Sequence, residues 1–239
     1  MVFPVSIPQA SLATAIGLSA AGIWMGTTPP NPSPDKVPDT GDSIRWTVTV
    51  QQKYGKILYL SLGAQALHHM ALVLTYPDRI PRPLLRYAAD NGLSEGAVTW
   101  SKDTAIPITL ILAGASLRLL AYSGLGTNFT YGLAEPDQLK TTGVYQYIQH
   151  PSYTGALALA AGALGLWWRA DGILSCFIPP RVFPLLKSLE PVMLGLALAS
   201  IATAAWKRVR DEEAMLYREF GKKWEDWHSR TARFIPFIF

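Results

Sequence analysis

The chain has 239 residues and a formal net charge of +4, with 49% hydrophobic and only 16% charged residues. Soluble domains carry about 25% charged residues, and here the apolar residues gather into long runs, which predicts an all-α polytopic membrane protein. The composition argues against nucleic acid as a partner, because eight of the 21 Lys and Arg residues follow Ala205, next to an apolar run, without a zinc-finger or RNA-binding motif.

The first apolar run covers residues 10–26 and is rich in Ala and Gly. Residues 19–21 resemble a signal-peptide cleavage site, but no Lys or Arg precedes the run, as a secretory signal normally requires. We therefore expect a retained membrane helix whose small residues suit close packing. Residues 29–45 hold five prolines and three aspartates and are predicted to form a loop.

The second apolar run covers residues 57–76 and contains His68 and His69. Neighbouring helical residues point about 100° apart, and no third ligand is placed nearby, so a packed or interfacial pair is favoured over a metal site. Residues 77–103 are polar, with many turn formers, and are predicted to be a loop.

The third run, residues 105–122, is interrupted by Arg118 close to its end. A charged residue inside a membrane helix is a candidate site residue. One within a turn of the helix end can equally extend its charge to the interface. Both interpretations of Arg118 stay open on the sequence.

The fourth run covers residues 153–168 and ends in a Trp pair typical of a membrane interface. Because a span needs about 20 residues, we expect residues 148–153 to extend it. Residues 169–182 are predicted to form a tight return, in which the only cysteine, Cys176, is buried and inert and cannot form an intrachain disulfide. The fifth run then covers residues 183–206, antiparallel to the fourth.

Five spans place the two termini on opposite sides of the membrane. With a cytoplasmic C-terminus, the inside segments hold thirteen Lys and Arg residues and the outside segments seven, which the positive-inside rule favours. The segment Tyr145–Tyr153 and the tail after Trp206 then lie on one face.

The tail carries Arg208, Glu212, Leu216 and Phe220 at four-residue intervals, which places them on one helix face ending at Gly221. Arg208 and Glu212 form either a surface ion pair or one wall of a ligand site. A guanidinium can hold a carboxylate in a fork, and the aromatic rings around His150 suit an onium ion beside a carboxylate. The same groups would also suit a phospholipid headgroup.

Several motifs in order along residues 105–239 resemble the isoprenylcysteine carboxyl methyltransferase family. They are Leu125–Thr130, Leu139–Tyr145, Gln149–Gly155, the pair Arg208 and Glu212 with Glu213, Phe220–Trp227 with its two tryptophans, and Phe234–Ile238. The first hundred residues are similar to the family only in being helical and apolar. We accordingly divide the chain into N-terminal membrane helices and loops, 1–104, and a membrane-embedded methyltransferase core with a cytosolic tail, 105–239.

The resemblance implies an endoplasmic-reticulum enzyme, a protein-S-isoprenylcysteine carboxyl O-methyltransferase. It would move a methyl group from S-adenosylmethionine to the C-terminal carboxylate of a prenylated cysteine, with the active site facing the cytosol. Its partners would be prenylated protein C-termini or a lipophilic small-molecule acid, together with membrane lipid. By position, Arg208 would orient the substrate carboxylate and act with Glu212 in catalysis. The cofactor would be held by Asp137, Gln138, Leu139, Lys140, Tyr145, His150, Pro151, Ser152, Tyr153 and Glu212.

The chain departs from the family at two positions. Gln149 stands where the family usually has Arg before His-Pro, and Asp137 stands where it often has His. These changes point to a cationic ligand or a changed acceptor, so an isoprenoid carboxylic acid or a phospholipid amine is an alternative substrate. A non-catalytic membrane scaffold or transporter is a further alternative. Phosphoryl and acyl transfer are disfavoured, since no phosphate loop or Gly-x-Ser-x-Gly turn occurs.

Overall fold

The computed structural model describes residues 5–31, 46–77, 80–129, 132–133 and 135–236. Within these ranges the backbone forms helices and no strand, apart from one isolated parallel bridge between Ile148 and Ala232. The predicted all-α class is therefore confirmed for the described part of the chain. Most of the predicted loop 29–45 lies outside the described residues.

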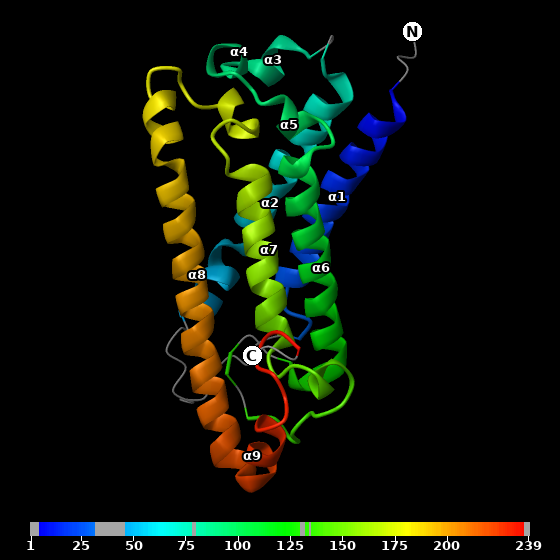
Figure 1. Cartoon of the computed structure of the whole chain (residues 1–239), viewed down its shortest axis with the longest axis vertical. Coiled ribbons are helices and arrows are strands. Elements are labelled where there is room, and N and C mark those ends of the chain that lie inside the picture. Colours follow the sequence, from blue (N-terminus) through cyan, green and yellow to red (C-terminus); the bar gives the residue numbers. More distant parts are fainter. Residues whose placement is uncertain (1–4, 32–45, 78–79, 130–131, 134, 237–239) are drawn as a thin grey trace. The chain divides into compact units, whose positions relative to one another are not determined.

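Five helices are long, and Figure 1 shows them in chain order from blue to orange. They are α1 (Ile7–Thr27), α2 (Trp46–Thr75), α6 (Lys102–Leu125), α7 (Pro151–Trp167) and α8 (Phe183–Phe220). Among the described residues, four of them are long and apolar enough to cross a membrane, namely α1, α2, α6 and α8. The protein is thus a polytopic membrane protein.

Helix α7 has only 17 residues and begins at Pro151, so the predicted helical extension over residues 148–150 is wrong. A proline suits the first position of a helix because its missing N–H needs no partner there. The preceding amides of Gln149 and His150 instead donate to the carbonyls of Ala232 and Arg233, at 2.8 and 3.0 Å. The C-terminal segment thus holds these residues outside the helix.

The segment predicted as a loop between α2 and α6 contains three single-turn helices, so the prediction is only partly right. They are α3 (Arg82–Leu85), α4 (Ala88–Asn91) and α5 (Glu95–Val98). Further short elements are the 3-10 helices η1 (Gly126–Asn128), η2 (Gly143–Gln146) and η3 (Ile173–Cys176), and the helix α9 (Lys222–His228).

Helix α8 runs without a break through the apolar fifth run and the charged tail. No Gly or Pro lies between Trp206 and Phe220, and the residues there are mostly strong helix formers, so the change from apolar to charged residues does not end the helix. The helix does end at Phe220, where Gly221 has a φ of +50°, as the sequence predicts. Glycine takes such a positive φ readily because it has no Cβ atom.

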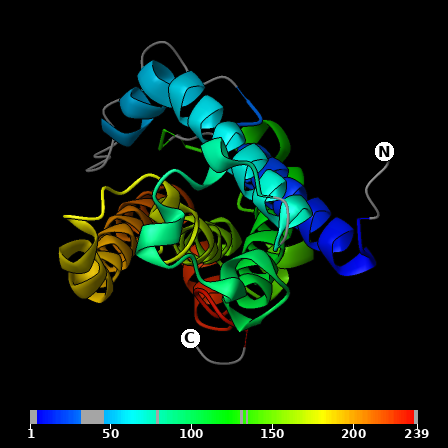
Figure 2. The same ribbon diagram turned by 90° about the horizontal axis from the view of Figure 1, so that it is seen from above.

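The chain divides into two compact units, each assembled from separate stretches. The first unit contains residues 1–24, 56–112 and 159–199. In it α1 lies along α2, as Figures 1 and 2 both show, and the Gln9 amide donates to the carbonyls of Val73 and Tyr76 at 3.2 and 2.6 Å.

The histidine pair of α2 is packed inside the first unit, as predicted. His69 is fully buried, with its Nε2 2.7 Å from the Ala97 carbonyl oxygen. The ring of His68 packs on Phe177 with a centroid distance of 4.8 Å. Cys176 is also buried, and burial raises the pKa of its thiol. These groups are part of a structural core.

The second unit contains residues 25–55, 113–158 and 200–239, and it holds the residues expected to bind cofactor and substrate. Its core joins the end of α6, the following loop and helices α8 and α9. The buried side chains of this core are Ala121, Leu133, Leu139, Tyr145, Met215, Leu216, Trp224 and Trp227.

Candidate functional site

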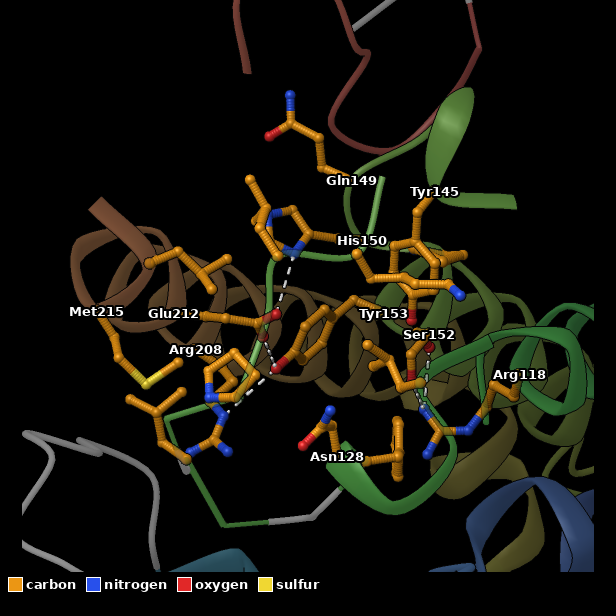
Figure 3. A pocket seen from close by; sticks show the side chains of 18 of the residues that line it. Arg118, Asn128, Tyr145, Gln149, His150, Ser152, Tyr153, Arg208, Glu212 and Met215 are labelled. Atoms are coloured by element: carbon orange, nitrogen blue, oxygen red, sulfur yellow. Dashed lines mark hydrogen bonds and ion pairs between the residues drawn. The ribbon is translucent and has the colours of Figure 1, made fainter. Parts of the chain in front are cut away.

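The second unit encloses a cavity of about 340 Å³. Its walls come from the end of α6 and the loop that follows, from the start of α7, and from the charged half of α8. Figure 3 shows the side chains of these segments pointing toward one another from facing elements. The segment Tyr145–Tyr153 and the tail helix thus line one cavity.

The hydroxyl of Tyr153 connects Arg208 and Glu212. It donates to Glu212 Oε2 at 2.8 Å and accepts from Arg208 Nε at 3.3 Å (Figure 3). Because Arg208 and Glu212 are one turn apart on α8, the phenol of α7 fixes both on the cavity side of the helix. Arg208 is only 6% exposed, so the pair is not a surface ion pair.

The imidazole of His150 is 3% exposed and lies between two carboxylates. Its Nδ1 is 3.8 Å from Glu212 Oε1, and its Nε2 is 3.4 Å from Glu213 Oε1. Its ring packs edge-on against Tyr153, with a centroid distance of 5.7 Å. Buried polar atoms are normally hydrogen-bonded, yet both ring nitrogens lack a hydrogen-bond partner within the structure described.

Tyr145 forms a neutral aromatic wall of the cavity. Burial, followed by the negative charge of Glu212, raises the pKa of its phenol. Its ring contacts α6 and lies so close to Gly124 that a Cβ atom there would be 3.1 Å from it. Its carbonyl oxygen accepts from the Trp227 indole at 3.1 Å, so α9 supports this wall from outside.

Arg118 turns into the protein and lines the cavity, which decides between its two interpretations. It is 7% exposed, and its Nη1 donates to the carbonyl and hydroxyl oxygens of Ser152 at 2.9 and 3.2 Å (Figure 3). Its Nε donates to the Tyr122 hydroxyl at 2.9 Å and also to the Gly26 carbonyl. Arg118 therefore ties α6 to the first turn of α7.

Most of the site residues expected from the sequence meet at this cavity. Those that line it are Gln138, Leu139, Lys140, Tyr145, His150, Pro151, Ser152, Tyr153, Arg208 and Glu212. Asp137 does not line it and is exposed. Gln149 is among the lining residues, but Figure 3 shows its side chain directed away from Tyr153 and Glu212.

The structure adds lining residues that the sequence interpretation missed. Asn128 belongs to the first family-like motif, and Met215 lies three residues after Glu212 on the same helical face, so both had a signal in the sequence. Thr27 and Gln51 also line the cavity, and the Gln51 amide donates to the Thr27 carbonyl at 3.3 Å. Nothing in the sequence around these two residues indicates the contact.

The cavity combines two buried guanidiniums, a carboxylate, an imidazole and two phenol rings. Guanidiniums bind carboxylates, whereas aromatic faces beside a carboxylate attract an onium group. The described residues contain no group of three His, Cys, Asp or Glu side chains that could hold a metal ion. The arrangement suits an organic ligand that carries both signs of charge.

A sequence profile of the isoprenylcysteine carboxyl methyltransferase family matches residues 106–189. Protein-S-isoprenylcysteine O-methyltransferase B of Arabidopsis thaliana is 28% identical over 139 residues, and the Xenopus laevis and Dictyostelium discoideum protein-S-isoprenylcysteine O-methyltransferases are 26% identical over 149 and 133 residues. The chain is thus similar to the isoprenylcysteine carboxyl methyltransferase family over part of its length.

These alignments cover 55%, 59% and 52% of this chain, and 58%, 42% and 46% of the three relatives in turn. The chain thus spans about half the length of the curated relatives that it matches. The profile of the methyltransferase family includes His150 and Tyr153 but ends before Arg208 and Glu212. No solved structure matches the chain.

Proposed function

We propose that this membrane protein transfers a methyl group from S-adenosylmethionine to the C-terminal carboxylate of a prenylated cysteine, forming a methyl ester. One observation carries the proposal. The Tyr153 hydroxyl holds Arg208 and Glu212 at one cavity, where a cation for an acceptor carboxylate lies beside an anion for a sulfonium. The similarity to the isoprenylcysteine carboxyl methyltransferase family supports the same reaction class.

The described residues fit S-adenosylmethionine in chemistry. On the cavity side, His150 offers its buried Nδ1, which lacks a hydrogen-bond partner in the structure described, and Tyr145 and Tyr153 offer aromatic faces beside the Glu212 carboxylate. Of the residues expected to hold the cofactor, all but Asp137 line the cavity. When bound, the cofactor supplies an electrophilic methyl group on a positively charged sulfur.

The protein's own groups would act by positioning and by excluding water. Arg208 would hold the acceptor carboxylate in a bidentate fork, and the Tyr153 hydroxyl would fix the guanidinium in place. A carboxylate is already a nucleophile, so the reaction needs no general base. Correct placement of two reactants can supply about 7–11 kcal/mol of the rate enhancement. Removing water from the carboxylate would raise its reactivity further.

The membrane arrangement is part of the proposal. We infer that α7 crosses the membrane as a fifth span, that the C-terminus is cytosolic, and that the enzyme resides in the endoplasmic reticulum. The charge distribution favours this orientation. We retain the division into an N-terminal region, 1–104, and a catalytic core, 105–239, as a hypothesis about which part carries the chemistry.

The test is a methyl-transfer assay on membranes that contain the protein. Labelled S-adenosylmethionine is supplied with farnesyl- and geranylgeranyl-cysteine analogues, and base-labile methyl esters are counted. We expect ester formation that falls at least about 100-fold in Arg208→Ala, because the acceptor carboxylate loses its cation. Arg218→Ala is the matched control, since Arg218 is exposed on the same helix. Absence of any ester on every prenylated acceptor contradicts the proposal.

The same assay separates the alternatives. A base-stable methyl product on a phospholipid amine, or an ester formed only on an isoprenoid carboxylic acid, would change the acceptor and keep the cofactor. A membrane scaffold or transporter would bind no S-adenosylhomocysteine, and Arg208→Ala would leave its behaviour unchanged. The buried Arg208 favours a carboxylate acceptor over an amine, because like charges repel.

A further inference from the structure

The C-terminal segment Thr231–Phe234 is fastened to the start of α7 by backbone contacts. Besides the amides of Gln149 and His150, which donate to this segment, the Thr154 hydroxyl donates to the Phe234 carbonyl at 3.0 Å. The side chain of Gln149 reinforces the junction. Its amide nitrogen donates to the carbonyls of His228, at 3.1 Å, and Thr231.

This junction places Arg233 against Glu213. The guanidinium contacts the carboxylate through two nitrogens, with Nε 2.7 Å from Oε1 and Nη2 3.4 Å from Oε2. The Glu213 side chain is only 6% exposed. A buried carboxylate is costly unless it is paired, and Arg233 supplies the pairing charge. A second cation, Arg210, is 3.7 Å from the same carboxylate but is 61% exposed.

Glu213 is also the nearer of the two carboxylates that face His150. Glu212 approaches Nδ1 from within the cavity, whereas Glu213 approaches Nε2 and is not among the residues that line it. The phenol of Tyr153 and the ring of Phe234 also lie near the imidazole, at centroid distances of 5.7 and 6.1 Å. The orientation of the imidazole therefore depends on both carboxylates.

We propose that Glu213 and Arg233 are positioning residues that hold the His150 ring toward the cofactor, which makes the C-terminal segment part of the site. This inference rests on the proposed function. Glu213 fixes one edge of the imidazole, and Arg233 keeps Glu213 ionised and aimed at it. Neither residue lines the cavity, so both act on the ligand only through His150.

The test is a double-mutant cycle on the full chain with S-adenosylhomocysteine as the probe. We expect Glu213→Gln and Arg233→Gln each to raise the Kd for S-adenosylhomocysteine about tenfold. The KM for S-adenosylmethionine should rise by about the same factor, and kcat should change less than about threefold. In a His150→Asn background, Glu213→Gln should add less than about twofold to Kd. Arg233→Lys keeps the charge and should recover most of the affinity, while Arg218→Gln should behave like the wild type.

Three outcomes would overturn the inference. The first is a double variant in which the effects of Glu213→Gln and His150→Asn on Kd multiply. The others are a fall in kcat as large as the rise in KM, and a failure of Arg233→Lys to restore the affinity. Where His150→Asn does not fold, the comparison of Arg233→Gln with Arg233→Lys decides. Failure of the proposed function differs, because the wild type then binds no S-adenosylhomocysteine. In that case thermal unfolding is measured for the wild type, Glu213→Gln, His150→Asn and the double variant. Additive changes in Tm would show that Glu213 does not act on His150.

Discussion

At the scale of single residues, the side chain of Gln149 has a different role in the structure from the one that its sequence position suggests. It departs from the family pattern beside a motif that we expect to bind the cofactor, and this position points to altered substrate choice. In the structure its amide nitrogen donates to two carbonyls of the C-terminal segment, and its amide oxygen is 2.7 Å from His228 Nδ1. A guanidinium at this position could donate to the same carbonyls. The departure therefore preserves a donor at the junction.

Two substitutions of Gln149 test this role. We expect Gln149→Ala to raise the KM for S-adenosylmethionine several-fold, because the C-terminal segment loses its side-chain anchor and the position of Arg233 loosens. Gln149→Arg should keep activity within about threefold of the wild type, because its guanidinium can replace the amide donor. The measurement is methyl transfer across several prenyl and non-prenyl acids. A changed order of acceptor preference in either variant would instead assign Gln149 to substrate choice.

At the scale of elements, close packing of α6 and α7 shapes the cavity. A Cβ atom on Gly155 would lie 2.6 Å from the Gly114 carbonyl oxygen and 2.7 Å from the Arg118 side chain. The absence of a side chain at Gly155 thus allows Arg118 to reach Ser152 on the next helix. Small residues are the usual means by which membrane helices approach each other this closely.

Gly155→Ala should therefore destabilise the protein by about 1–3 kcal/mol, since the neighbouring backbone cannot yield without moving a helix. The accompanying shift of Arg118 should also weaken cofactor binding. Gly195→Ala is the matched control, because no atom lies within 4 Å of the Cβ it would add. Its stability should change by less than about 1 kcal/mol. Thermal unfolding in detergent measures both, and equal effects of the two substitutions would contradict the packing argument.

Helix α9 introduces a pH dependence through its last residue. His228 stacks on Trp224 with a centroid distance of 4.3 Å, and its Nε2 is 3.3 Å from Arg233 Nη2. Burial, aided by the positive charges of Arg233 and Arg210, lowers the pKa of His228, although Glu213 opposes the change. The folded state thus favours the neutral ring. Its stabilising contribution is complete above the unfolded value of about 6.5 and is lost as the pH falls below it.

We expect the Tm of the wild type to fall between about pH 7 and pH 5, because the unfolded state binds the His228 proton more tightly. His228→Asn removes the titrating group and should flatten this part of the profile, with a lower Tm at neutral pH. Unfolding followed by tryptophan fluorescence over that range provides the measurement. An unchanged slope in the variant would exclude His228 as the source.

At the scale of the whole molecule, the number of membrane crossings decides which side the site faces. Among the described residues, four helices are long and apolar enough to span a membrane, whereas α7, with 17 residues, is somewhat shorter than a typical span of about 20 residues. Three long helices, α6, α7 and α8, lie between Lys102 and Arg230. These two exposed positions therefore lie on opposite sides of the membrane only if α7 crosses it.

Single reporter cysteines at these positions test the orientation. In a Cys176→Ala background, Arg230→Cys should react with a membrane-impermeant maleimide from the cytosolic side, and Lys102→Cys only after the membrane is opened. This result follows from the positive-inside distribution with α7 as a span. Labelling of both cysteines from one side would instead reduce the crossings to four and place both termini together.

The sequence by itself determines the membrane class and the long helices, and its motifs predict a reaction class. Apolar runs, helix-ending residues such as Gly221, and motifs at a characteristic spacing are local properties. Local patterns also predicted the main polar residues of the cavity, since His150 and Tyr153 lie in one motif and Arg208 and Glu212 share a helix face. They misplaced the start of α7, because its boundary depends on backbone contacts with residues more than 80 positions away.

Only the tertiary structure decides what Arg118, Gln149 and Glu213 do. Each could have been a solvated polar group on sequence grounds, and each is buried by segments that are distant in the chain. Burial makes an unpaired charge or amide costly. Ser152, Thr231 and Arg233 provide the hydrogen-bond partners that allow Arg118, Gln149 and Glu213, in that order, to be buried. A one-dimensional pattern contains no information about those pairings, because they form only when the chain has folded.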